Sequence, residues 1–201
     1  YYCLYPDRTV ILMDTNPQIE QVWQYLISAS KSEVLILPDV SAGDNVREFG
    51  LTLPEELLLG FCVNPGSSQA KVTATARSQW NRLKPKLAEF VPKIKHWTIL
   101  QSSYLDAPDI AATWFIDPPY QVAGKYYFGY KDMNYDELAA WVGWLHGQVI
   151  CCDNAGATYL PFQPFRDLRS FVRVNQEVVF ERSCDCCSLQ SESVSMVVSE
   201  R

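Results

Sequence analysis

The sequence feature that most constrains this chain is a short apolar segment that ends in an acid and two prolines. The run Ala112–Ile116 reads Ala-Thr-Trp-Phe-Ile, and Asp117, Pro118, Pro119 and Tyr120 follow it. Apolar, aromatic-rich runs bounded by turn residues predict buried strands. Open α/β sheets place ligand-binding residues at the carboxyl ends of such strands. The sequence therefore predicts an α/β fold with a site at this strand end.

The residues after the strand suit recognition of a flat heterocycle that carries an amino group. Proline fixes the backbone and lacks an N–H, so we expect carbonyl groups at Pro118 and Pro119 that no local N–H pairs with. Asp117 adds a carboxylate acceptor, and Tyr120 adds an aromatic face with a polar tip. An acid, a carbonyl and an aromatic ring held at one strand end predict binding of an amino-substituted ring.

The rest of the chain alternates between strand and helix patterns. Thr9–Asp14 predicts a strand that ends in an acid, and Asn16-Pro17 predicts the start of a helix with apolar residues at helical spacing. Such alternation predicts a sheet with helices on both of its faces. Further strands are expected at Trp97–Leu100, Gln148–Cys152, Ser170–Val174 and Glu177–Glu181, and a helix at Tyr135–His146.

The charge distribution leaves two interpretations open. A net charge of −6 argues against a generally basic nucleic-acid-binding protein. However, seven of the 17 basic residues lie between Lys71 and Lys95, where Glu89 is the one acid. This segment is either a solvated helix face or a surface that contacts phosphates, with Lys71, Arg77 and Arg82 as the candidate contacts.

The cysteines and the length of the apolar runs indicate the cellular compartment. Seven cysteines, an odd number, without a leader sequence favour a reducing cytosol. No apolar run approaches the roughly 20 residues of a membrane-spanning helix, so we expect a cytoplasmic, monomeric protein without a membrane partner. Residues Ser183–Arg201 are rich in Ser, Cys and Glu and predict a disordered tail. Because no histidine stands at ligand spacing to Cys184, Cys186 and Cys187, we predict no metal site.

Taken together, these motifs resemble the S-adenosylmethionine-dependent DNA adenine-N6 methyltransferases, in particular small phage and bacterial methylases of the D12 class. The resemblance covers residues 1–182. It is carried by Thr113–Gln121, by Asp153–Ala157 with Leu160–Phe162, and by the strand and helix of Val10–Leu26. The family's Phe-x-Gly-x-Gly loop would lie just upstream of Tyr1, so the chain resembles an N-terminally truncated member.

The resemblance implies a Rossmann-like methyltransferase domain made of residues 1–52 and 97–182, which lacks its first strand and glycine loop. A small helical and loop insertion at 53–96 would recognise the target. The implied reaction moves a methyl group from S-adenosylmethionine to N6 of an adenine flipped out of double-stranded DNA. Asp117 and Pro118 would accept the amino protons, Pro119 would stiffen the loop, and Tyr120 would stack on the base.

The resemblance also implies binding residues. Asp14 would bind the cofactor ribose, although a turn or cap role explains that residue equally well, and Ser103 and Tyr104 would meet the cofactor adenine. The basic residues Lys71, Arg77 and Arg82 would contact DNA in a bacterial or phage-infected cell, in the context of restriction and modification. Two alternatives remain: an inactive DNA-binding remnant of a methylase, and an enzyme that methylates N4 of cytosine.

Overall fold

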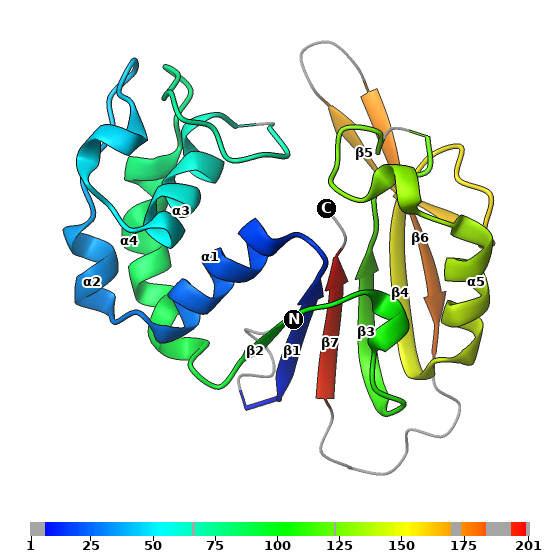
Figure 1. Cartoon of the computed structure of the whole chain (residues 1–201). Helices are drawn as coiled ribbons and strands as arrows, with labels where there is room; N and C mark the ends of the chain where they lie inside the picture. Colours follow the sequence, from blue (N-terminus) through cyan, green and yellow to red (C-terminus); the bar gives the residue numbers. More distant parts are fainter. Residues whose placement is uncertain (1–6, 66, 123, 170–173, 184–193, 200–201) are drawn as a thin grey trace. The chain divides into compact units, whose positions relative to one another are not determined.

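The computed structural model describes residues 7–65, 67–122, 124–169, 174–183 and 194–199. Contacts along the chain divide it into two compact units. One unit comprises the residues up to Asn16 and those from Thr98 onward, and it contains a seven-stranded sheet (Figure 1). The other unit, Pro17–Trp97, is built from helices.

The sheet unit has the strand order β2-β1-β7-β3-β4-β6-β5. The first five strands in this order, β2-β1-β7-β3-β4, run parallel to one another. β6 runs antiparallel to both β4 and β5. The protein is therefore an α/β protein with a mixed sheet, compatible with a Rossmann-like fold. In chain order the strands are β1 (Val10–Asp14), β2 (Thr98–Gln101), β3 (Ala111–Asp117), β4 (His146–Asn154), β5 (Gln163–Arg169), β6 (Val174–Arg182) and β7 (Val194–Ser199).

The helix α5 (Tyr135–Trp144) packs against this sheet. It precedes β4, and exposure alternates along β3 as expected of a strand with one buried face. The buried face of β3 carries Trp114 and Ile116, which pack with Leu138 and Val142 of α5 in one core. Burying an apolar side chain of this size contributes about 1.5–3 kcal/mol. This core therefore fixes the position of the strand that ends at Asp117.

The helical unit has a separate core. α1 (Pro17–Ser28) packs against α3 (Leu53–Val63), and α2 (Lys31–Ile36) packs against α4 (Trp80–Phe90). Trp80 is fully buried at the start of α4, and its indole N–H donates a hydrogen bond of 2.8 Å to the Pro38 carbonyl. None of the helices in the described part of the chain combines the length and apolar composition that crossing a membrane requires. Both units also contain short 3-10 helices. η1 (Val46–Phe49) and η2 (Val91–Lys93) lie in the helical unit, and η3 (Tyr104–Asp106) and η4 (Tyr130–Asp132) lie in the sheet unit.

The helical unit begins earlier than the predicted insertion at residues 53–96. It starts at Pro17, because α1 shares its core rather than belonging to the sheet unit. The buried residues Val22 and Leu26 of α1 lie in the same cluster as Leu59 of α3. An amphipathic helix packs against whichever apolar surface it reaches, which the periodicity of its sequence does not reveal.

The prediction of a disordered tail is wrong for Val194–Ser199. These residues form β7, which lies in the middle of the sheet and pairs with β1 and β3 (Figure 1). Met196 and Val198 are buried in the core shared with α5. The run Val-Ser-Met-Val-Val-Ser has the β-branched residues of a strand, but its Ser- and Cys-rich surroundings hid that signal. The tail cysteines Cys184, Cys186 and Cys187 lie outside the described residues.

Candidate active site

The carboxyl edge of the parallel strands carries a row of polar residues. By strand register, Asp14 at the end of β1 pairs with Gln101 of β2 and with Ser199 of β7, and Ser199 pairs in turn with Asp117 of β3. Neighbouring strands lie about 4.8 Å apart, so the Cα atoms of Asp14 and Asp117, two strands apart, are separated by about 10 Å. The sheet thus places the two acids predicted from the sequence in one row.

This row lies where the order of the strands reverses. From β1 the chain goes on to β2 on one side, whereas from β3 it goes on to β4 on the other side. In open α/β sheets, ligands bind outside the carboxyl ends of the strands at such a switch point. Asp14 and Asp117 therefore lie where the topology predicts a binding site.

The loop after β3 is held tightly. Pro118 and Pro119 are buried, while Asp117 and Tyr120 are partly buried. The Tyr135 hydroxyl of α5 donates a hydrogen bond of 2.6 Å to the Pro119 carbonyl. The Pro119 carbonyl is thus already paired with a side chain, so Pro118 carries the candidate acceptor of the two.

Gly124 closes the same loop. Its N–H donates a hydrogen bond of 2.6 Å to the Tyr120 carbonyl. A Cβ atom at this position would lie 2.3 Å from the Tyr120 nitrogen and 2.6 Å from the Pro119 carbonyl carbon. Only glycine allows the chain to approach itself this closely.

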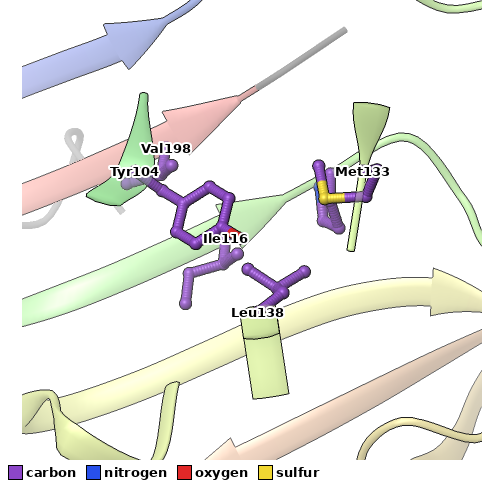
Figure 2. A pocket seen from close by; sticks show the side chains of 6 residues that line it. Tyr104, Ile116, Met133, Leu138 and Val198 are labelled. Carbon is purple, nitrogen blue, oxygen red and sulfur yellow. The ribbon is translucent and has the colours of Figure 1, made fainter. Parts of the chain in front are cut away.

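Beside the loop lies a shallow apolar recess that is too narrow to hold a water molecule (Figure 2). Tyr104 and Pro118 both line it, so the structure brings a predicted cofactor-binding residue and a predicted catalytic residue to one recess. Tyr104 is 5% exposed and packs edge-on against Trp141 of α5, with ring centroids 5.0 Å apart. Ser103 caps η3, because its hydroxyl accepts a hydrogen bond from the Leu105 N–H at 3.3 Å. The other lining residues are Ile116, Met133, Leu138 and Val198.

Asp14 has the turn role that the sequence left open. It is 3% exposed, and its Oδ1 accepts a hydrogen bond of 2.8 Å from the Asn16 N–H, which caps the turn after β1. A carboxylate has about four lone-pair sites, so this cap is compatible with a second role. Next to it, the hydroxyl oxygens of Thr15 and Ser102 are buried, and neither has a hydrogen-bond partner among the described residues. Sequence reasoning missed these two hydroxyls, because a single Ser or Thr after a strand forms no pattern.

A buried acid that belongs to the Asp153–Ala157 motif, but was given no role from the sequence, lies on the other side of the loop. Asp153, at the end of β4, is fully buried. Its Oδ1 accepts a hydrogen bond of 2.7 Å from the Asn154 N–H, and its Oδ2 accepts one of 3.3 Å from the Gln121 N–H. Burial raises the pKa of Tyr135, and the negative charge of Asp153 raises it further. Tyr135 therefore keeps its proton and remains a donor at neutral pH.

Tyr159 completes this cluster. Its hydroxyl lies 3.6 Å from the Cys151 sulfur, and its ring packs against Tyr135 with centroids 5.1 Å apart. Burial raises the pKa of Tyr159, with smaller contributions from Cys151 and Asp153. Burial likewise raises the pKa of Cys151, so this thiol stays protonated and is no nucleophile.

The predicted DNA contacts lie in the helical unit. Arg77 and Arg82 are exposed and Lys71 is partly buried. The Arg82 guanidinium donates a hydrogen bond of 2.7 Å to the Gln79 side chain, on the turn before α4. The two arginine side chains are thus accessible to a ligand. All three predicted contacts lie in the helical unit.

Two other lysines of the basic segment have structural roles. Lys84 pairs with Asp39 and donates a hydrogen bond of 2.9 Å to the Leu37 carbonyl at the end of α2. Lys95 donates one of 2.8 Å to the Ile27 carbonyl at the end of α1. Cations at helix C-termini are stabilising. The basic segment is therefore partly a set of helix caps.

Comparison with known proteins adds no family to this description. No protein-family model matches the chain, and no similar protein was found among curated proteins. The functional interpretation therefore depends on the residues at the carboxyl edge of the sheet and on the strand order that brings them together.

Proposed function

We propose that this protein transfers a methyl group from S-adenosylmethionine to N6 of an adenine flipped out of DNA. The observation that carries the proposal is the row formed by Asp14, Ser199 and Asp117 at the switch point of the parallel sheet. Beside that row, Pro118 and Tyr104 share one recess. Two acids in one row at a switch point suit a site that binds two polar ligands side by side.

In this proposal the loop after β3 binds the target amino group. The Asp117 carboxylate and the Pro118 carbonyl each accept one hydrogen bond from the two amino protons. This draws the nitrogen lone pair out of conjugation with the ring and directs it toward the methyl group. Tyr120 stacks on the base, a contact worth about 1–3 kcal/mol. Because the base is unreachable inside the duplex, it has to be flipped out.

The residues at the ends of β1 and β2 fit the cofactor chemically. The buried, unpartnered hydroxyls of Thr15 and Ser102 and the carboxylate of Asp14 suit a ribose diol, which both donates and accepts hydrogen bonds. The Ser103 turn and Tyr104, which follow β2, carry the contacts to the cofactor adenine in this proposal. S-adenosylmethionine supplies an electrophilic methyl group on a sulfonium, so the chain's own task is to position the acceptor nitrogen.

DNA binding is assigned to the helical unit. Because Lys84 and Lys95 cap helices, the proposal keeps the three residues named from the sequence, Lys71, Arg77 and Arg82, as phosphate contacts. Arg77 and Arg82 are exposed, as contacts to a phosphate backbone require. Contacts of this kind position a duplex without reading its sequence.

Replacing Asp117 tests the proposal. The Asp117→Ala variant should lower the rate of DNA methylation about 100-fold or more, because it removes an acceptor aimed at the reacting nitrogen. Asp109→Ala is the matched control, since Asp109 precedes β3 and its side chain is 89% exposed. The measurement is methyl incorporation into DNA, with the modified base mapped.

The mapped product decides between the candidate functions. N6-methyladenine supports the proposal, whereas N4-methylcytosine reassigns the same site to the other exocyclic amino group. Equal methylation by wild type and Asp117→Ala excludes this loop as the catalytic one. DNA binding by the wild type without any methylation favours the inactive remnant.

A further inference from the structure

A loop that contains two consecutive prolines lacks the usual means of being held in place. Neither Pro118 nor Pro119 has an N–H, so the backbone cannot donate a hydrogen bond at either position. The contacts that fix this loop must come from carbonyl groups or from the residues that follow it. Among the described residues several such contacts are present, including one of 3.4 Å from the Tyr130 hydroxyl to the Gln121 carbonyl. Two of them, one from α5 and one from β4, carry the inference.

The first contact comes from α5 and the second from β4. The Tyr135 hydroxyl donates to the Pro119 carbonyl at 2.6 Å, from the first residue of α5. Oδ2 of Asp153 accepts from the Gln121 N–H at 3.3 Å. The Gln121 side chain also accepts a hydrogen bond of 2.8 Å from the Thr158 N–H. Gln121 is thus joined to the end of β4 through its backbone and to the loop after β4 through its side chain.

The two contacts belong to one cluster of side chains, in which Asp153 is fully buried and the aromatic residues are partly buried. A buried carboxylate is costly unless hydrogen bonds compensate it, and Asp153, fully buried, accepts from two backbone N–H groups. The ring of Tyr159 packs on Tyr135, and Phe162 packs on Tyr159 with centroids 5.0 Å apart. Packing of this kind restricts the Tyr135 ring, so its hydroxyl has a fixed direction.

We propose that Tyr135 and Asp153 are positioning residues that aim the Pro118 carbonyl and the Asp117 carboxylate by holding the loop at Pro119 and Gln121. The proposal rests on the proposed function, because the direction of these two acceptors matters only if they accept hydrogen bonds from an amino group. Neither residue touches the substrate in this role. Each acts through the peptide that it holds.

The test uses two near-isosteric substitutions. Tyr135→Phe removes the hydroxyl alone, and Asp153→Asn keeps the shape but replaces one acceptor oxygen with a donor group. Each should lower kcat about 10- to 100-fold, because small misplacements of reacting groups are costly. KM for DNA should stay near the wild-type value, since neither residue contacts the substrate.

Amide hydrogen exchange supplies a second readout that does not need activity. The Gln121 and Gly124 N–H groups, which donate to Asp153 and to the Tyr120 carbonyl, should exchange about 10-fold faster in both variants. Amides of β1 and β7 should be unchanged. Tyr25→Phe is the matched control, because Tyr25 is a partly buried tyrosine of the helical unit, and it should alter neither kcat nor loop exchange.

The two readouts separate the two proposals. Unchanged exchange at Gln121 and Gly124, or faster exchange throughout the sheet, overturns the positioning role. Faster local exchange with an unaltered kcat overturns it as well, because the held loop then does not set the rate. A wild type that binds DNA and never methylates it contradicts the proposed function, whereas the exchange data still decide whether the pair holds the loop.

Discussion

At the scale of single residues, the site is built from groups that compensate for what proline lacks. Tyr135 supplies a hydroxyl donor to the Pro119 carbonyl, and Gly124 lets the chain return close enough to pair with Tyr120. The residue types follow from the geometry. A hydroxyl on a rigid ring reaches the carbonyl from α5, and only a residue without Cβ fits against the peptide that follows Pro119.

The Gly124 position gives a prediction at this scale. Gly124→Ala places a methyl group 2.3 Å from the Tyr120 nitrogen and 2.4 Å from its carbonyl oxygen. The loop has to move, so we expect a loss of stability of about 1–3 kcal/mol and a large loss of methyl transfer. Urea unfolding and the methylation assay measure the two effects.

Gly143→Ala is the control for that substitution. Gly143 lies in α5, and a Cβ there meets nothing within 4 Å. Alanine favours a helix over glycine by up to about 1 kcal/mol, so this variant should be as stable as wild type or more so. A stable and active Gly124→Ala protein would show that the loop tolerates rearrangement and that its geometry does not limit the reaction.

At the scale of elements, sequence periodicity was informative where an element has one apolar face. It predicted β1, α1, β3, α5 and β4 close to their observed positions, because each combines a buried face with clear boundaries. Of the expected closing pair of strands, Glu177–Glu181 is confirmed within β6, Ser170–Val174 lies largely outside the described residues, and β5, where the register shifts between Pro164 and Arg166, was not predicted. It missed β7 altogether, because the Ser- and Cys-rich residues around this short run hid its strand pattern.

The same limits apply to the site. Asp117 and Pro118 were proposed as site residues from local sequence, since the strand and the turn residues are adjacent. Asp153 and Tyr135 were not, because their roles depend on contacts to Gln121 and Pro119 across 32 and 16 residues of chain. Side chains that hold a loop from another element leave no local signature. Only the packing of α5 and β4 beside β3 reveals them.

The contact between α1 and α3 gives a prediction about pH. Burial raises the pKa of Tyr25 in α1 to about 12, with further contributions from the charges of Glu55 and Glu33. The unfolded chain has a tyrosine pKa of about 10. Above that pH the unfolded state releases a proton that the folded state keeps, so stability is lost as the pH rises from about 10 to about 12.

Tyr25→Phe removes this contribution. The free energy of unfolding of the wild type should therefore fall more steeply between pH 9 and pH 12 than that of the variant, as measured by urea unfolding at a series of pH values. The other buried tyrosines titrate in both proteins and cancel in the comparison. Parallel curves would mean that Tyr25 ionises equally easily in the folded and unfolded states.

At the scale of the whole molecule, charge and architecture are divided between two units. The chain carries a net charge of −6, yet Lys71, Arg77 and Arg82 all lie in the helical unit, Pro17–Trp97. The acids of the proposed active site, Asp14 and Asp117, lie in the sheet unit. An acidic protein that binds DNA has to concentrate its phosphate contacts, because its overall field opposes association.

This division predicts how salt affects DNA binding. Each phosphate contact contributes a slope of about −0.9 to the dependence of log K on log salt concentration. Replacing Lys71, Arg77 and Arg82 with glutamine should therefore reduce the slope by up to about 2.7 and weaken binding similarly for all DNA sequences. Fluorescence anisotropy at a series of salt concentrations measures this, with Lys31→Gln as control because Lys31 pairs with Glu89. An unchanged slope in the triple variant would make the basic segment a solvated face with helix caps at Lys84 and Lys95, and would move the DNA contacts to other residues.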